Sequence, residues 1–137
     1  MDRRTLIGRM ALAGAATLLA TAPAHAAGKG EKKAAGVSTY VPVPTIVGTT
    51  RRADGRRGVM SVECGLEAPD PQLRARAEAS LPRLRSAFMS TVQTYAAGLP
   101  AGAAPNVDFI ARALQQQADA VLGRPGARVL LGAVVVN

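Results

Sequence analysis

The sequence has few of the side chains on which most enzymes depend. Its only histidine is His25, near the N-terminus, and its only cysteine is Cys64. Without a histidine after position 25, the rest of the chain cannot form a Ser-His-Asp or Cys-His arrangement or a histidine-bearing metal site. One cysteine provides neither an intrachain disulfide nor a thiolate cage for a metal ion. We therefore expect a protein that is not an enzyme and that holds no cofactor.

Aromatic residues are also scarce, since the chain has two tyrosines, two phenylalanines and no tryptophan. Recognition of sugars or nucleotides by stacking on aromatic rings is therefore poorly supported. Glu63 and Glu67 are the one pair of acids that could do acid–base work, because most of the others have structural positions. Asp54 lies in a turn, and Asp70 and Asp108 begin helices, where carboxylates stabilise free amides. The two glutamates flank a strand end with no evident pocket, which makes an enzyme the weakest hypothesis.

The first 26 residues have the three parts of an export signal. Arg3 and Arg4 form a short basic region, residues 10–21 form an apolar run, and Ala24 and Ala26 are the small residues that signal peptidase requires. The apolar run of about a dozen residues is too short for a bilayer core, which needs about twenty. We predict cleavage after Ala26 and export to the periplasm.

Two interpretations of this leader remain open. Arg3 and Arg4, followed by Thr-Leu-Ile, resemble a twin-arginine signal, and the apolar run diluted by glycine and alanine fits that weakly hydrophobic class. The alternative is an ordinary secretory signal in which two positive charges happen to be adjacent. On either interpretation the protein is anchored to the inner membrane only if the signal is not cleaved.

The charged residues are mostly basic, and the formal net charge is +8. Four arginines gather in one loop: Arg51, Arg52, Arg56 and Arg57. An exported basic protein meets anionic lipid headgroups, cell-wall polymer and acidic proteins, so we expect no nucleic-acid partner. The loop arginines are therefore a candidate contact for an anionic partner. The alternative is that they blunt an exposed hairpin tip and keep a small domain soluble.

The chain after the leader is predicted to be one small domain behind a linker. Residues 27–37 combine glycine, alanine and charge without a period, which is typical of a flexible linker. Residues 38–137 have the length of a single domain. Its first segment, residues 38–49, predicts a strand that Pro42 and Pro44 restrict to a sheet edge, because proline donates no ladder hydrogen bond. The alternative is a short strand preceded by an extended Pro-x-Pro segment.

A second strand is predicted at residues 57–66, where apolar and polar residues alternate. Its buried face consists of Met60, Val62, Cys64 and Leu66. We interpret Cys64 as a packing thiol, with a reactive site as the alternative. Asp54 and Gly55 are a turn signal because both tolerate positive φ, so the two strands should form an antiparallel hairpin with the four arginines around its tip.

Two helices are predicted next. Asp70 and Pro71 begin the first, whose apolar residues recur every three or four positions: Leu73, Ala77, Leu81, Leu84, Phe88, Val92 and Tyr95. Pro82 lies inside this pattern and predicts a kink or a restart between Ser80 and Pro82. Asn106 caps the second helix, whose apolar residues are Val107, Ile110, Ala111, Leu114, Ala118, Val121 and Leu122.

The chain closes with an apolar segment at residues 128–137 that is rich in valine. A nearly continuous run of β-branched residues predicts a strand covered on both faces, and we expect it beside the strand at 57–66. The predicted fold class is α+β, a small antiparallel sheet of the N-terminal hairpin plus the C-terminal strand. Two helices, the first kinked at a proline, should pack on this sheet.

Four segments in this order resemble the periplasmic domain of the flagellar basal body-associated FliL proteins. They are residues 40–47 (Tyr-Val-Pro-Val-Pro-Thr-Ile-Val), 67–73 (Glu-Ala-Pro-Asp-Pro-Gln-Leu), 81–87 (Leu-Pro-Arg-Leu-Arg-Ser-Ala) and 128–136 (Arg-Val-Leu-Leu-Gly-Ala-Val-Val-Val). In that family a Tyr-x-Pro-x-Pro-like opening, a Pro-x-Leu/Ile-Arg-Asp helix segment and a closing valine-rich strand recur in the same order. The resemblance covers residues 40–137.

This resemblance implies a stomatin-like α+β domain that forms homo-oligomers and works by contact with protein partners at the flagellar stator and basal body. It thus implies a non-enzymatic interaction protein that supports motility and self-associates through strand edges or helix faces. The chain departs from the family in two places. FliL proteins keep an N-terminal membrane helix, whereas residues 1–26 look cleavable, and Ser86 and Ala87 replace the usual acidic position after Arg85, so no site residue transfers. A basic envelope-binding module unrelated to motility, using the loop arginines, is the alternative.

Overall fold

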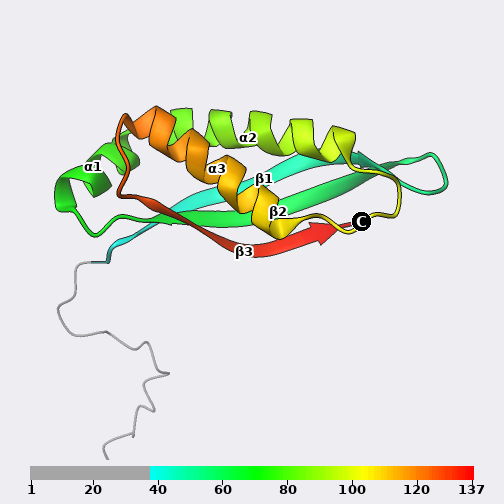
Figure 1. Cartoon of the computed structure of the whole chain (residues 1–137), viewed down its shortest axis with the longest axis horizontal. Helices are drawn as coiled ribbons and strands as arrows, with labels where there is room; N and C mark the ends of the chain where they lie inside the picture. The colour runs from blue at the N-terminus through cyan, green and yellow to red at the C-terminus, as the bar shows by residue number, and fades with distance from the viewer. Residues whose placement is uncertain (1–37) are drawn as a thin grey trace, which may run out of the picture. The chain divides into compact units, whose positions relative to one another are not determined.

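The structure is a computed structural model and describes residues 38–137. The elements in chain order are β1 (Tyr40–Arg51), β2 (Arg57–Glu67), α1 (Pro71–Ala79), α2 (Leu81–Gly98), α3 (Val107–Leu122) and β3 (Arg128–Val136). The strands form an antiparallel sheet in the order β1-β2-β3, and α2 and α3 cover one face of it (Figure 1). The predicted α+β class is confirmed. The predicted leader and linker lie outside the described residues.

The β1–β2 hairpin forms as the turn residues predict. The two strands pair from Tyr40 opposite Glu67 to Arg51 opposite Arg57. In the turn between them Gly55 has a φ of +79°, a conformation that glycine adopts without strain. The register shifts between Val43 and Ile46, around the second proline, and β1 is an edge strand. The prolines thus lie where the missing N–H groups interrupt no interior ladder.

The core lies between the sheet and the helices. The predicted inner face of β2 is confirmed, since Met60, Val62, Cys64 and Leu66 are all buried. The opposing helices contribute Leu84, Phe88 and Val92 from α2 and Ile110, Leu114 and Leu122 from α3. Each fully buried side chain of this size stabilises the fold by about 1.5–3 kcal/mol relative to its exposed state. The apolar periodicity of both helical segments therefore marks the face that packs on the sheet.

The long helical segment is broken rather than kinked. The structure has two helices, α1 and α2, which meet at Ser80, whose φ of −98° and ψ of 5° leave the helical range. Pro82 lies in the first turn of α2, where its missing N–H costs no hydrogen bond. At the start of α1 the carboxylate of Asp70 accepts the Gln72 N–H at 2.9 Å. Of the two predicted alternatives the restart is thus confirmed, and it gives three helices where two were predicted.

β3 pairs with β2 as predicted, with Val129 opposite Leu66 and Val136 opposite Met60. The prediction that it is covered on both faces was wrong. β3 is the second edge of the sheet, and Val135 is 46% exposed. All three helices follow the hairpin and precede β3, and α2 and α3 lie on one side of the sheet (Figure 1), so nothing in the described residues covers its other side. No described helix is both long and apolar enough to cross a membrane.

Candidate functional site

The four loop arginines lie together at one end of the domain. Arg51 and Arg57 face each other as the last pair of the hairpin, and Arg52 and Arg56 are in the turn that joins the strands. The Arg52 N–H donates to the Arg56 carbonyl oxygen at 2.8 Å, which closes the turn. All four are exposed, on a hairpin end that extends past the C-terminal end of α2 (Figure 1). We call these four residues the arginine tip.

A cavity of about 470 Å³ lies where the arginine tip meets β1 and α2. Its lining residues are Thr49, Thr50, Arg51, Gly55, Arg56, Arg57, Gln93 and Ala97. This lining contains three guanidinium groups and no carboxylate, so it favours an anion. The Gln93 side-chain oxygen accepts the Thr49 N–H at 3.3 Å, which joins α2 to the outer edge of β1.

One of the three arginines is partly neutralised. The Arg56 Nε lies 4.0 Å from Asp54 Oδ2, and the Arg56 side chain is 82% exposed, so the ion pair contributes little to stability. The Asp54 Oδ1 accepts the Arg56 N–H at 2.9 Å, which holds the carboxylate in the turn. Arg51 and Arg57 have no ion-pair partner among the described residues. They are the guanidinium groups most open to an external anion.

A second cavity of about 660 Å³ lies between the arginine tip and the loop that joins α2 to α3. Its lining includes Arg51 and Arg52 but also the carboxylate of Asp54, so its charge is mixed. Thr50 borders both cavities, and its buried hydroxyl lacks a hydrogen-bond partner among the described residues. Because its lining contains no carboxylate, the cavity of about 470 Å³ is the better anion site of the two.

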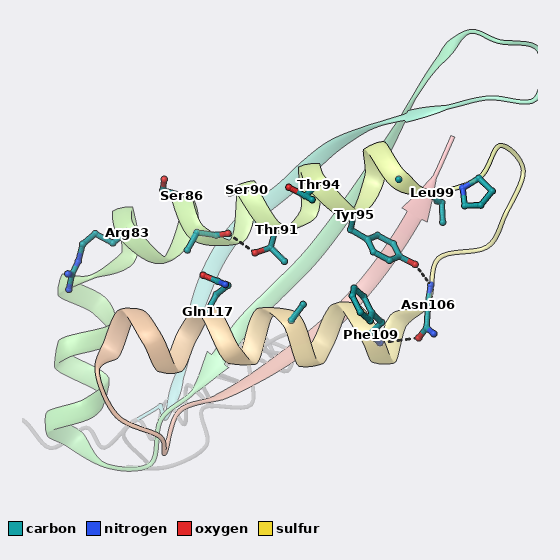
Figure 2. Close-up of a pocket in the computed structure, with 14 residues that line it drawn as sticks. Arg83, Ser86, Ser90, Thr91, Thr94, Tyr95, Leu99, Asn106, Phe109 and Gln117 are labelled. Atoms are coloured by element: carbon teal, nitrogen blue, oxygen red, sulfur yellow. Dashed lines mark hydrogen bonds between the residues drawn. The ribbon is translucent and has the colours of Figure 1, made fainter.

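A larger groove of about 1010 Å³ runs between α2 and α3 (Figure 2). At one end Tyr95 and Phe109 stack with ring centroids 5.5 Å apart. The Asn106 N–H donates to the Tyr95 hydroxyl at 2.7 Å, and the Asn106 side chain accepts the Phe109 N–H at 3.0 Å, which caps α3 as predicted. Arg83, at the other end, is the one charged residue among the lining residues (Figure 2).

The sequence did not predict this groove, because its pattern identified only the apolar face of each helix. The signal available was the spacing of Ser86, Ser90 and Thr94, which puts three small polar side chains on one face of α2. No acid or histidine lines the groove, so its side chains offer contacts and hydrogen bonds but no general base.

The structure does not bring Glu63 and Glu67 together as a pair for acid–base work. Glu63 and Glu67 lie four residues apart on one strand, β2, which separates their Cα atoms by about 13 Å. Glu67 Oε2 lies 3.7 Å from the Arg128 Nη2 across the β2–β3 pair. No group of three or more potential metal ligands exists among residues 38–137. The acid–base role considered for these glutamates has no geometric support.

Cys64 is buried as predicted for a packing thiol. Burial raises the pKa of the thiol from 9.0 to about 11, because the thiolate would lose its hydration. Because the thiolate is the reactive form of cysteine, burial and the raised pKa both disfavour reaction at Cys64.

Asp70 also has a shifted pKa. The Gln72 N–H and then the Arg124 side chain, 2.6 Å away, hold the pKa of this carboxyl below its usual value. Both partners are structural, since one starts α1 and the other follows α3, and the contact ties these two elements together.

The described residues therefore define a small two-layer α+β domain with a basic tip, an open helix groove and an uncovered sheet face. No family model matches the chain, and no curated protein is significantly similar to it.

Proposed function

We propose that the protein is a non-enzymatic periplasmic interaction protein of the FliL-like type, which self-associates and supports the flagellar basal body or stator. The observation that carries this proposal is that the described helices cover only one side of the sheet. In the described part of the chain, one face of the sheet carries no helix, and β1 and β3 each have an edge that pairs with no strand. Part of that face is apolar and exposed, as at Val47, Val59 and Val135. Exposed apolar patches of this kind mark contact surfaces.

The element order also supports the proposal. A hairpin of strands, a proline-interrupted helical segment, a capped helix and a closing valine-rich strand follow one another as the resemblance implies. The leader supports the compartment, since Arg3, Arg4, Ala24 and Ala26 fit an exported protein.

Two measurements test this function. Sedimentation velocity of the mature protein, beginning at Ala27, should show an association that increases with concentration. Deletion of the gene should reduce swimming in soft agar, and a plasmid copy should restore it. A strict monomer together with normal swimming of the deletion strain would contradict the proposal.

A second candidate is a basic module that binds anionic lipid or cell wall. The specific observation in its favour is the acid-free cavity lined by Arg51, Arg56 and Arg57. Sedimentation with vesicles containing phosphatidylglycerol should be lost in the R51E/R57E variant and should weaken as salt rises.

The matched control for this second candidate is R112E/R85E, which makes the same charge change at exposed arginines of α3 and α2, outside the lining of both tip cavities. Equal loss of vesicle binding in both double variants would show a general charge effect and contradict a site at the arginine tip.

A further inference from the structure

The face of the sheet that the helices leave open carries a concentrated set of apolar side chains. In the described part of the chain, four of the eight exposed large hydrophobic residues lie on it: Tyr40, Val47, Val59 and Val135. The register places Val47, Ser61 and Val135 side by side across the three strands. Leu130, half-buried, lies opposite Gly65 and points the same way. The apolar residues therefore form one continuous surface, which we call the open face.

The open face is low in relief. Tyr40 lies across Gly65, where a Cβ atom would collide with the tyrosine ring. The ring therefore rests against the backbone of β2 rather than standing out from the sheet. Gly132 on β3 adds another position without a side chain, beside Glu63. Sheets of this kind pack face to face about 10 Å apart, with their strands within about 30° of each other.

The charges on the open face are separated along the strands. On β2 the side chains that point away from the helices include Arg57 at one end and Glu63 and Glu67 toward the other, with Val59 and Ser61 between them. Arg51, paired with Arg57, adds to the basic end. Arg128, 3.7 Å from Glu67, offsets one of the two carboxylates. The face therefore has a basic end, an apolar centre and an acidic end.

We propose that a second copy of this chain stacks on the open face, related by a two-fold axis that crosses the strands near position 62. This inference rests on the proposed function and names the surface through which the protein self-associates. Arg57 and Glu67 are each five residues from the axis, about 16 Å along the strand. The two-fold therefore places Arg57 of one copy opposite Glu67 of the other, twice in each dimer. It also lays Val47 and Val59 of one copy on the half of the face that holds Tyr40 and Leu130.

Charge complementarity selects this occupant and this orientation. A two-fold axis along the strands would instead put basic end on basic end and acidic end on acidic end, which costs free energy. A partner of uniform charge would match only one half of the face. The surface is thus complementary to itself in the crossed orientation, as a two-fold interface requires.

The size of the open face sets the strength of the contact. Three strands of about nine residues present an area of about 30 Å by 14 Å. This is at the low end of specific interfaces, so the dimer should be reversible, with a Kd in the range of about 1–100 μM.

The test uses charge reversal in sedimentation velocity of the mature protein. R57E and E67R should each weaken self-association at least about tenfold, because each homodimer would then hold two like-charged contacts. An equimolar mixture of R57E and E67R should associate again, since both contacts in the mixed dimer have opposite charges. The double variant R57E/E67R should associate with itself. V59K, in the apolar centre, should be monomeric, whereas R112E on α3 should behave as the wild type.

The outcomes separate this inference from the proposed function. Wild-type association that R57E, E67R and V59K leave unchanged would overturn the open face as the interface, while self-association through another surface, such as the β3 edge, would stand. Loss of association in both single variants without recovery in their mixture would overturn the two-fold arrangement. A wild type that stays monomeric at every concentration overturns both. Circular dichroism of each variant shows that a loss is not due to unfolding.

Discussion

At the scale of single residues, the described part of the chain uses its polar groups to hold turns and helix ends. Asp54 closes the hairpin turn, Asp70 caps α1 and Asn106 caps α3. Gln115 donates to the Ala127 carbonyl at 2.8 Å and accepts the Val129 N–H at 2.8 Å, which guides the chain from α3 into β3. These polar side chains therefore have structural roles in the turns, caps and connections of the domain.

The first prediction concerns Cys64. Its pKa is raised from 9.0 in the unfolded chain to about 11 in the folded one, so the folded state keeps a proton that the unfolded state loses. The free energy of unfolding should therefore be unaffected by this group below pH 9 and fall between pH 9 and 11, by roughly 2–3 kcal/mol in total. Urea unfolding of the wild type and of C64A at several pH values measures the difference.

In C64A the part of the pH dependence that belongs to the thiol should disappear, although the variant is less stable at every pH. The same decrease between pH 9 and 11 in both proteins would contradict the assignment of this pH dependence to Cys64. A thiol-specific reagent gives an independent check, since the native wild type should react far more slowly than the unfolded chain.

At the scale of elements, the distance between α2 and β1 depends on Gly48. A Cβ atom on Gly48 would lie 2.8 Å from the Ala96 Cβ and 3.1 Å from the Val92 carbonyl oxygen, both on α2. These neighbours belong to a helix backbone or are attached directly to it, so they move only with the helix. Gly48 therefore sets how closely α2 packs on the hairpin.

The second prediction is that G48A lowers the free energy of unfolding by about 1–3 kcal/mol, because α2 must move away from β1. The matched control is G98A, near the end of α2, where an added Cβ meets nothing within 4 Å. This control should be neutral or stabilise the protein by up to about 1 kcal/mol, since alanine favours a helix more than glycine does. Equal stability of G48A and the wild type in urea unfolding would contradict the close approach.

At the scale of the whole molecule, the open two-layer arrangement distributes stability unevenly. β2 is hydrogen-bonded on both sides and its inner residues are buried, whereas β1 and β3 each have one unpaired edge. The arginine tip extends past the C-terminal end of α2 (Figure 1). Local opening should therefore be most frequent at the tip and rarest in β2.

The third prediction follows for amide hydrogen exchange measured by mass spectrometry. Peptides from β2 should exchange most slowly, those from β1 and β3 at intermediate rates, and residues 52–56 within the shortest labelling time. The control is the monomeric variant V59K, in which the same order should hold, because face-to-face stacking covers side chains and not the strand edges. Exchange in β3 as slow as in β2 would indicate that the β3 edge is paired with another chain.

Local sequence patterns determined the elements of this domain and the residues that form its core. The alternation at residues 57–66 and the steps of three and four after Asp70 depend only on side-chain directions in a strand or helix, so they identify the buried faces correctly. The Asp54-Gly55 turn determined the hairpin, and with it the arginine tip, because a turn acts between neighbours in the chain. The restart of the helix between Ser80 and Pro82, predicted as the alternative to a kink, depends on the proline in the same local way.

Tertiary structure alone decided which surfaces are covered. The valine-rich run of β3 looks the same whether one or both of its faces are buried, since burial depends on where α2 and α3 lie. Val107, placed on the buried face of α3 by its spacing, is 45% exposed because it lies at the N-terminal end of the helix, one turn before the first buried residue, Ile110. The groove between α2 and α3 and the open face of the sheet arise in the same way. Both form from residues far apart in the sequence, and their positions depend on packing that no local pattern encodes.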